Sequence, residues 1–336
     1  MVRYPLGMHV SFTLPNRGVL FGVTTVDEML DLAHEADETG LFQTVWVGDS
    51  LLGKPRLESI SLLSALAART RQVHLGPACM ASFPLRDPVL LAYQWASLDL
   101  MTQGRTILVA CTGLVEQAGA QVEGALYGVE AKDRVQRLIE WIEILRRLWT
   151  ENEVVFEGRQ YRFSGVSVDP KPAAQPPPIW IASNATGSRD LVVRTLRRAA
   201  VHADGWQTST YSRHELAWRI PELLRHVAEA GKDPAAYPVS LYHNININED
   251  RQAALEESQR FLETYYTPAR FPIPVVEQWV ASGSPAECVE HLAGLRDLGA
   301  TEVCLRLTSF DQRGQFRRLV EEVVPQLLAA SPSKTG

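Results

Sequence analysis

Apolar and polar residues follow a repeated pattern of short apolar runs and longer amphipathic segments. Eight runs rich in β-branched and aromatic residues, each bounded by turn signals, predict strands. They span residues 7–14, 44–49, 73–80, 106–113, 178–183, 202–208, 238–248 and 301–309. Apolar residues at helical spacing predict at least one helix after each strand. These helices span residues 26–40, 57–70, 87–101, 133–149, 188–200, 213–230, 251–266, 284–299 and 312–329.

The alternation indicates an α/β fold. Strands that are apolar throughout and are each followed by a helix are typical of parallel strands buried on both faces. Right-handed βα crossovers repeated eight times close into a barrel, so we predict a single-domain (β/α)₈ TIM barrel over residues 1–330. The structural alternative is an open doubly wound sheet, which usually carries a glycine fingerprint after its first strand. Residues 13–22, TLPNRGVLFG, do not match GxGxxG.

Two segments interrupt the alternation. Residues 151–178 predict a small hairpin, VVFEG against RQYRF, followed by a proline-rich connection. Residues 267–283 form a second, irregular insertion, and residues 331–336 are expected to be a disordered tail. Since βα alternation resumes after each insertion, neither marks a domain boundary.

Composition narrows the class of protein. The chain has 336 residues, 46% of them hydrophobic, and a net charge of -6, which suits a large core and argues against nucleic acid as a main partner. No apolar run reaches the roughly 18 residues that a membrane span needs, and no signal peptide is evident, so we expect a cytoplasmic protein without membrane contact. The four cysteines form no CxxC or Cys/His cluster, which favours reduced thiols and no metal site.

The loop after the third predicted strand is unusually apolar. Residues 76–88, GPACMASFPLRDP, carry no charge until Arg86 and contain three prolines. One interpretation is that a flat, partly apolar molecule lies against this loop, at the strand ends where barrel enzymes have their sites. The alternative is that Cys79, Met80 and Phe83 fill the barrel mouth as packing.

Three segments, in order along most of the chain, carry a family resemblance. Residues 58–113 contain a helix ending in AART, a strand ending in LG, a loop ending in proline, and a helix with ASLD before GR. Residues 176–206 contain PIWIAS and ADGW, and residues 282–307 contain SGSP followed by LGATEV. Together these segments resemble the bacterial luciferase-like superfamily of flavin- and deazaflavin-dependent barrels.

The resemblance implies where a cofactor would bind. Its ring would lie against the end of the third strand, across a non-prolyl cis peptide at Ala78–Cys79 and beside Met80. Its phosphate would lie at SNATGS, where backbone amides and a helix N-terminus favour an anion; a Ser/Asn helix cap uses the same groups. The residues implied there are Ser183, Asn184, Thr186, Gly187 and Ser188, and Thr112 and Gln117 would contact the ring or tail.

Acid–base residues match the family less well. Relatives often have an acidic residue followed by histidine after the second strand, whereas this chain has Asp49 followed by Ser50. Asp49 remains a catalytic candidate, but a serine hydroxyl cannot act alone as a general acid. Leu114 occupies the position of a glutamate in glucose-6-phosphate-type deazaflavin dehydrogenases, and both differences argue against that branch.

Three other polar side chains lie on the predicted strands. His9 and His243 are catalytic candidates as proton donors, and a hydrogen-bonded structural role is the alternative for each. Arg306, late in the eighth strand, could orient an anionic group or form a salt bridge with a loop carboxylate.

Three functions are compatible with the sequence. The leading hypothesis is a flavin-dependent monooxygenase that uses O₂ and reduced FMN, supplied by a separate flavin reductase, to oxidise a small apolar organic substrate. The alternative is an F420-dependent oxidoreductase that transfers a hydride. A third is a non-catalytic flavin-binding or partner subunit, which the missing histidine at position 50 keeps open.

The long loops predict the substrate pocket and one helix predicts an interface. Apolar residues in the loops at 114–132 and 267–283 suggest an apolar substrate, with a dimer interface as the other interpretation. They are Leu114, Val115, Leu126, Phe271, Ile273, Val275 and Trp279. The helix that contains LESISLLSALAA is unusually apolar for the outside of a barrel, which favours a homodimer.

Overall fold

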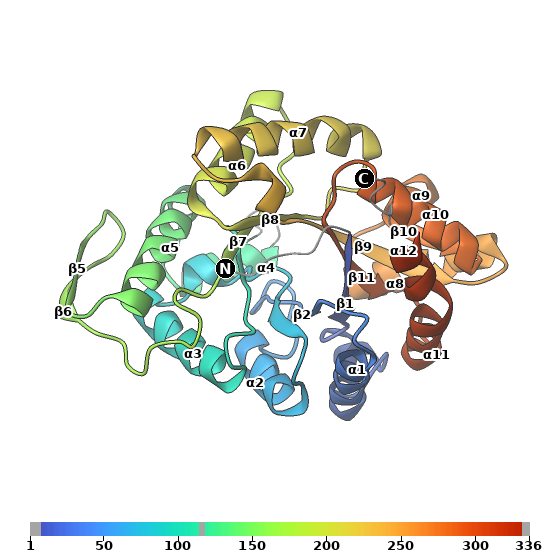
Figure 1. The fold of residues 1–336 in the computed structure, drawn as a ribbon, viewed down its shortest axis with the longest axis horizontal. Coiled ribbons are helices and arrows are strands. Elements are labelled where there is room, and N and C mark those ends of the chain that lie inside the picture. Colours follow the sequence, from blue (N-terminus) through green and yellow to red (C-terminus); the bar gives the residue numbers. More distant parts are fainter. Residues whose placement is uncertain (1–7, 114–117, 331–336) are drawn as a thin grey trace, which may run out of the picture.

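A computed structural model describes residues 8–113 and 118–330, and eight of its strands form a nearly closed parallel barrel (Figure 1). These strands are β1 (His9–Leu14), β2 (Thr44–Val47), β3 (His74–Pro77), β4 (Leu108–Ala110), β7 (Ile179–Ala182), β8 (Gly205–Thr208), β9 (Val239–Ile247) and β11 (Glu302–Leu307). The tail expected at 331–336 lies outside the described residues.

The strand order confirms the predicted barrel. Neighbouring strands run β3-β2-β1-β11-β9-β8-β7-β4, and all of their pairings are parallel. Single bridges between Leu75 and Thr106 and between Met80 and Ala110 join β3 to β4 and close the ring. The chain is therefore one (β/α)₈ domain, and its carboxyl strand ends gather at one mouth.

Helices surround the strands in Figure 1. They are α1 (Val26–Thr39), α2 (Ser59–Arg69), α3 (Pro88–Met101), α4 (Ala118–Leu126), α5 (Arg134–Thr150), α6 (Arg189–His202), α7 (Arg213–Glu229), α8 (Arg251–Tyr265), α9 (Ile273–Trp279), α10 (Pro285–Arg296), α11 (Gln312–Arg318) and α12 (Val324–Ala329). Within the described ranges, no helix has the length and apolar character needed to cross a bilayer.

Local sequence explains several helix ends. Asp87 caps α3 by accepting a hydrogen bond from the Leu90 amide at 2.8 Å, and Pro88 fits the first turn because that position needs no N–H donor. Ser284 and Glu287 form a capping box at the start of α10.

The last predicted helix is interrupted. A π-helical segment, η5 (Leu319–Val323), separates α11 from α12. Pro325, at the start of α12, has no amide hydrogen, so it cannot continue a regular helical ladder through this segment.

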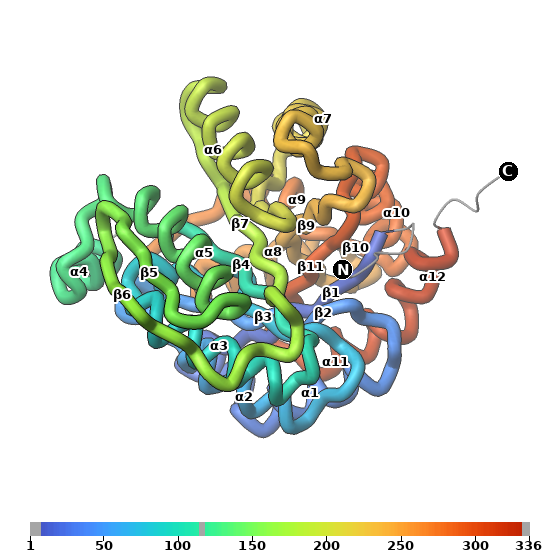
Figure 2. The backbone as a smooth tube through the Cα atoms, turned by 60° about the vertical axis from the view of Figure 1, so that its left-hand side comes forward, coloured from blue at the N-terminus to red at the C-terminus, as the bar shows by residue number. Residues whose placement is uncertain are grey.

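Residues 151–178 contain an antiparallel hairpin, β5 (Val154–Glu157) and β6 (Arg162–Val166), which Figure 2 shows outside the barrel, near α5. Glu140 of α5 accepts hydrogen bonds from the amides of Arg159 and Gln160, both at 2.9 Å. These two hydrogen bonds anchor the hairpin turn to α5.

Residues 267–283, which the pattern presents as irregular, contain α9 and the strand β10 (Val280–Gly283). β10 pairs with β9 from Asn244 to Ile247, beyond the residues that pair with β8. The sequence conceals both elements because α9 has only seven residues and β10 only four, too few for a recognisable period.

Bulky side chains fill the barrel interior. Trp46, Ile107, Val109, Trp180 and Cys304 form one buried cluster, and the Trp46 indole donates to the Glu302 carboxylate at 3.0 Å. Four partly buried residues pack on this cluster: Ala78, Cys79, Ala182 and Tyr242. Ala78, Cys79 and Ala182 lie at or just beyond strand ends, and the Tyr242 side chain joins them from the middle of β9. These four residues form the floor of the mouth, and we call them the floor below.

Candidate active site at the barrel mouth

The loop after β3 supplies half of the floor. The Ala78–Cys79 peptide bond is cis, as the family resemblance implies. The Cys79 thiol lies 2.8 Å from the Cys111 sulfur at the end of β4, and all four cysteines of the chain are free. Ala78 and Cys79 are small and only partly buried, so a flat ring could approach the backbone here.

Asp49 anchors this loop through hydrogen bonds to its carboxylate. One carboxylate oxygen accepts from the Ser82 amide at 2.8 Å, and the other accepts from the Ser59 hydroxyl at 2.7 Å and from the Arg86 guanidinium at 3.3 Å. The carboxylate is buried, and these bonds join the end of β2 to the loop after β3. This geometry is that of a positioning residue.

The loop between β7 and α6 has the features expected of an anion site. Thr186, Gly187 and Ser188 are exposed, and Gly187 has a φ of 108°, which glycine adopts without strain. Ser188 caps α6 by accepting a hydrogen bond from the Leu191 amide, whereas the amides of Arg189 and Asp190, at the start of this 14-residue helix, donate to no described residue.

Three hydrogen bonds to two side chains hold this loop beside β8. The Trp206 indole donates to the Ser183 hydroxyl at 2.9 Å. The Asn184 side-chain oxygen accepts from the Thr208 hydroxyl at 2.9 Å and from the Ser209 amide at 2.6 Å. Ser183 and Asn184 therefore shape the loop, and the amides beyond them are available to a ligand.

The remaining predicted cofactor residues lie in different settings. Met80 is fully buried and packs in the main core outside the barrel, so its side chain is not part of the floor. The Thr112 carbonyl accepts from the Arg134 guanidinium at 3.0 Å, and Thr112 itself is half-buried. Gln117, with Leu114 and Val115, lies outside the described residues.

The two candidate histidines lie away from the mouth. His9 is the first residue of β1 and pairs with Glu302, the first residue of β11, so it occupies the amino end of the barrel. His243 lies in the middle of β9, and its ring contacts His291 of α10 on the outer side of the sheet. Neither is positioned to reach a ligand at the strand ends.

The His243–His291 pair predicts an acid-sensitive stability. The Nε2 atoms lie 2.9 Å apart, so one neutral ring donates to the other. Burial lowers the pKa of His243 well below its ordinary value, and burial with the nearby Arg213 charge lowers the pKa of His291 to about 4. Below about pH 6.5 the unfolded chain binds protons that the folded chain does not, so His291 alone should lower the free energy of unfolding by roughly 2–3 kcal/mol between pH 6.5 and 4, and His243 should add to that fall.

Urea unfolding across this pH range measures the effect. Replacing both histidines with phenylalanine should flatten the decline, whereas His214→Gln, at an exposed histidine, should leave it unchanged. Identical pH curves for the double variant and the original protein would contradict the assignment.

A group of cations and aromatic rings forms the other side of the mouth. Arg306 is fully buried between Asn244 and Tyr266, and Lys54 lies 4.7 Å above the Tyr266 ring. Trp279 stacks on Tyr266, and Phe271 packs against both rings. Sequence reasoning singled out Arg306, Phe271 and Trp279 but missed Lys54 and Tyr266. Lys54 follows β2, so its place beyond a strand end was the available signal.

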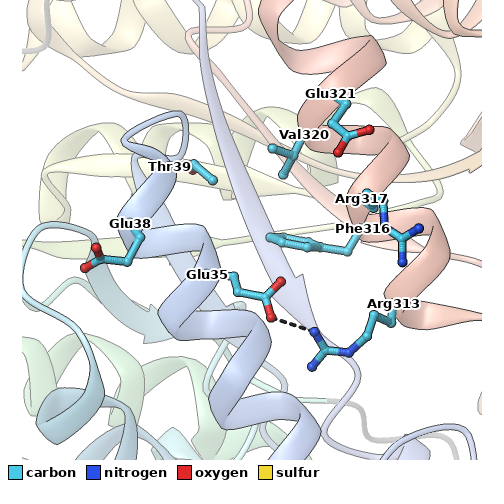
Figure 3. A pocket seen from close by; sticks show the side chains of 8 residues that line it. All are labelled: Glu35, Glu38, Thr39, Arg313, Phe316, Arg317, Val320 and Glu321. Carbon is cyan, nitrogen blue, oxygen red and sulfur yellow. Dashed lines mark hydrogen bonds and ion pairs between the residues drawn. The ribbon is translucent and has the colours of Figure 1, made fainter.

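A groove elsewhere on the molecule is not part of this site. Figure 3 shows it between α1 and the segment from α11 into η5, lined by charged side chains such as Glu38 and Arg317. Glu35 and Arg313 face each other there as an ion pair. The groove lies on the outer faces of two helices, away from the strand ends, and an exposed ion pair of this kind is common on protein surfaces without a ligand.

Comparison with known proteins places this geometry in context. Residues 8–302 match the family model described as luciferase-like monooxygenase. An F420-dependent glucose-6-phosphate dehydrogenase from Nakamurella multipartita is 27% identical over 326 residues, covering 90% of this chain and 93% of the relative.

Solved structures share the fold. An F420-dependent secondary alcohol dehydrogenase, in complex with an F420-acetone adduct, superposes with a TM-score of 0.80 at 16% identity, covering 96% of this chain and 99% of that one. The monooxygenase RslO1 from Streptomyces bottropensis superposes with a TM-score of 0.77 at 21% identity, covering 95% and 99%.

Proposed function

Because the chain belongs to the luciferase-like monooxygenase family and is an oxidoreductase, we propose that it is an F420-dependent enzyme that transfers a hydride to or from a small organic substrate. The geometric observation that carries the proposal is the half-exposed floor at Ala78 and Cys79, with the open amides at Thr186 to Ser188 on the same rim. A flat ring with an anionic tail fits that combination.

The named relatives support F420 over the leading sequence-based hypothesis of reduced FMN. Curated relatives that cover about nine tenths of the chain are F420-dependent dehydrogenases. An FMN-dependent monooxygenase, with O₂ and a separate flavin reductase, is therefore the second candidate. The solved structures that share this fold include monooxygenases, which supports this second candidate.

The chain's own residues would have distinct tasks. Ala78, Cys79 and Ala182 would support the ring, and the amides near Gly187 would hold the negative charge of the tail. Asp49 would hold the Cys79 loop in place through the Ser82 amide. When bound, F420 supplies a ring carbon that accepts or donates the hydride.

Binding distinguishes the two cofactors. We expect F420 to quench the protein's tryptophan fluorescence with a dissociation constant at least tenfold below those of FMN and reduced FMN. Tighter binding of reduced FMN, with oxygen uptake when a flavin reductase and NAD(P)H are added, would instead establish the monooxygenase. Failure to bind any of the three would contradict both.

We also propose a homodimer, through α3 rather than through the apolar helix α2. α2 turns Leu62, Leu63 and Leu66 into the chain's own core, whereas α3 exposes Leu90 and Tyr93 on one face. Sedimentation velocity on the original protein and on Tyr93→Glu tests this: a monomer in both would contradict it.

A further inference from the structure

Four cations gather at one side of the barrel mouth. Arg17 follows β1, Lys54 and Arg56 follow β2, and Arg306 ends β11; we call them the cationic cluster. Among the described residues, none of the four has a carboxylate oxygen within 4.0 Å. Buried or half-buried cations are usually paired, so this accumulation of positive charge requires an explanation.

Arg306 forms the base of the cluster. Its Nε and Nη2 donate to the Asn244 side-chain oxygen at 3.1 and 2.8 Å, and its Nη1 donates to the Tyr266 hydroxyl at 2.7 Å. Asn244 in turn donates to the Trp279 carbonyl at 3.1 Å. None of these partners is a carboxylate, so they fix the guanidinium in place without forming an ion pair with an acidic side chain.

Arg17 adds a second buried guanidinium. Its Nη1 donates to the Tyr265 carbonyl at 2.6 Å, and its Nε is buried with no hydrogen-bond partner in the described part of the chain. Arg56 lies 6.0 Å from the Tyr265 ring, and its Nε donates to the Lys54 carbonyl. The contact of Arg56 with Tyr265 places the segment between β2 and α2 next to the C-terminal end of α8.

Lys54 and Arg56 are the half-buried members of the cluster, and the Lys54 ammonium is the one that lies over the aromatic rings of the mouth. This ammonium lies 4.7 Å from the centre of the Tyr266 ring without a hydrogen-bond acceptor among the described residues. Burial lowers the pKa of Lys54; Tyr266 opposes this shift, and the charges of Arg56, Arg17 and Arg306 add to it. Burial alone would raise the pKa of Tyr266, but the charges of Arg306 and Lys54 outweigh it and lower that pKa.

We propose that Lys54, supported by Tyr266 and Arg306, binds an anionic group of the substrate, a carboxylate or a phosphate. The inference rests on the proposed function, because that function makes this mouth the substrate site. An ammonium without an acceptor, above a phenol ring and beside three guanidinium groups, has high affinity for an anion and low affinity for an uncharged group.

The aromatic wall restricts the rest of that substrate. Trp279 stacks on Tyr266, and the rings of Tyr211 and Phe271 pack at a tilt against Trp279. A planar or apolar body could lie against these rings while its anionic end meets Lys54. We therefore expect a substrate with an apolar or planar body, as the loops suggest, and an anionic group at one end.

Calorimetric titration with sodium benzoate and with inorganic phosphate tests the subsite at low ionic strength. We expect at least one of them to bind, the neutral benzamide not to bind, and Lys54→Gln to weaken the binding about tenfold or more. Lys132→Gln is the matched control, because that lysine is exposed and paired with Glu130. Preference for benzoate assigns a carboxylate, and preference for phosphate assigns a phosphate.

Repeating the titration with saturating F420 separates the two proposals. Lys54-dependent anion binding that persists with F420 bound supports a substrate subsite. If F420 fails to bind but the Lys54-dependent anion still does, the cofactor assignment fails and the subsite stands. Binding of neither anion, equal affinity in Lys54→Gln, or displacement of the anion by F420 would overturn the subsite.

Discussion

Asp49→Ala should cost about 2–4 kcal/mol of the free energy of unfolding and remove cofactor binding, because it removes a buried hydrogen-bond acceptor and one of the two carboxylate partners of Arg86, whose other partner is Glu58. The Asp49 side chain is 1% exposed and that of Arg86 is 15% exposed. Loss of the carboxylate also leaves the Ser82 amide and the Ser59 hydroxyl without their acceptor. The Cys79 loop would lose its main fastening to β2.

Urea unfolding and fluorescence titration with F420 measure the two effects. Asp31→Ala is the matched control, since Asp31 and Arg69 form an ion pair in which both side chains are 49% exposed. That variant should change the free energy of unfolding by less than about 1 kcal/mol. If Asp49→Ala were as stable as Asp31→Ala and still bound cofactor, the positioning role would be wrong.

Gly76→Ala should be similarly damaging, with a loss of about 3 kcal/mol or more, at the upper end of the range for overpacked cores. A methyl group at Gly76 would overlap the Ile107 carbonyl oxygen of the neighbouring chain segment and lie 2.7 Å from the Trp46 ring. Both neighbours are buried inside the barrel, so relief requires β3 to move. Because Ala78 and Cys79 continue β3, the floor would move with it.

Thermal unfolding and cofactor titration of Gly76→Ala measure this effect. Gly128→Ala serves as the control: its φ of 63° is also unfavourable for alanine, but no atom lies within 4 Å of the added methyl. We expect about 1 kcal/mol for that conformational cost alone. Equal losses of stability in the two variants would contradict this prediction, because they would mean that β3 accommodates a methyl group at position 76.

The barrel could be predicted because its information is local. Each strand and most helices have their own apolar period, and caps such as Asp87 and Ser284 mark boundaries within a few residues. Elements shorter than two helical turns, such as α9, carry no comparable signal. The helix that ends at Ala329 was predicted as continuous because periodicity does not reveal how one proline changes the ladder.

The site was predictable only in part. The loop around Cys79 and the turn around Gly187 could be located because strand ends and resemblance both indicate them. The contact of Lys54 with Tyr266 joins positions more than 200 residues apart, and no local pattern encodes it. His243 shows the converse limit, since alternation along a strand does not say which side faces the interior.

The pairing of β1 with β11 has a consequence for synthesis of the chain. Thr13 and Cys304, which touch across the interior, are 291 residues apart in sequence. Until the ribosome has released the C-terminal strand, β1 has one edge with unpaired amides and carbonyls, the kind of edge that recruits other chains. Nascent chains shortened before Glu302 should therefore be the aggregation-prone species in the cell, and they are natural clients for a chaperone.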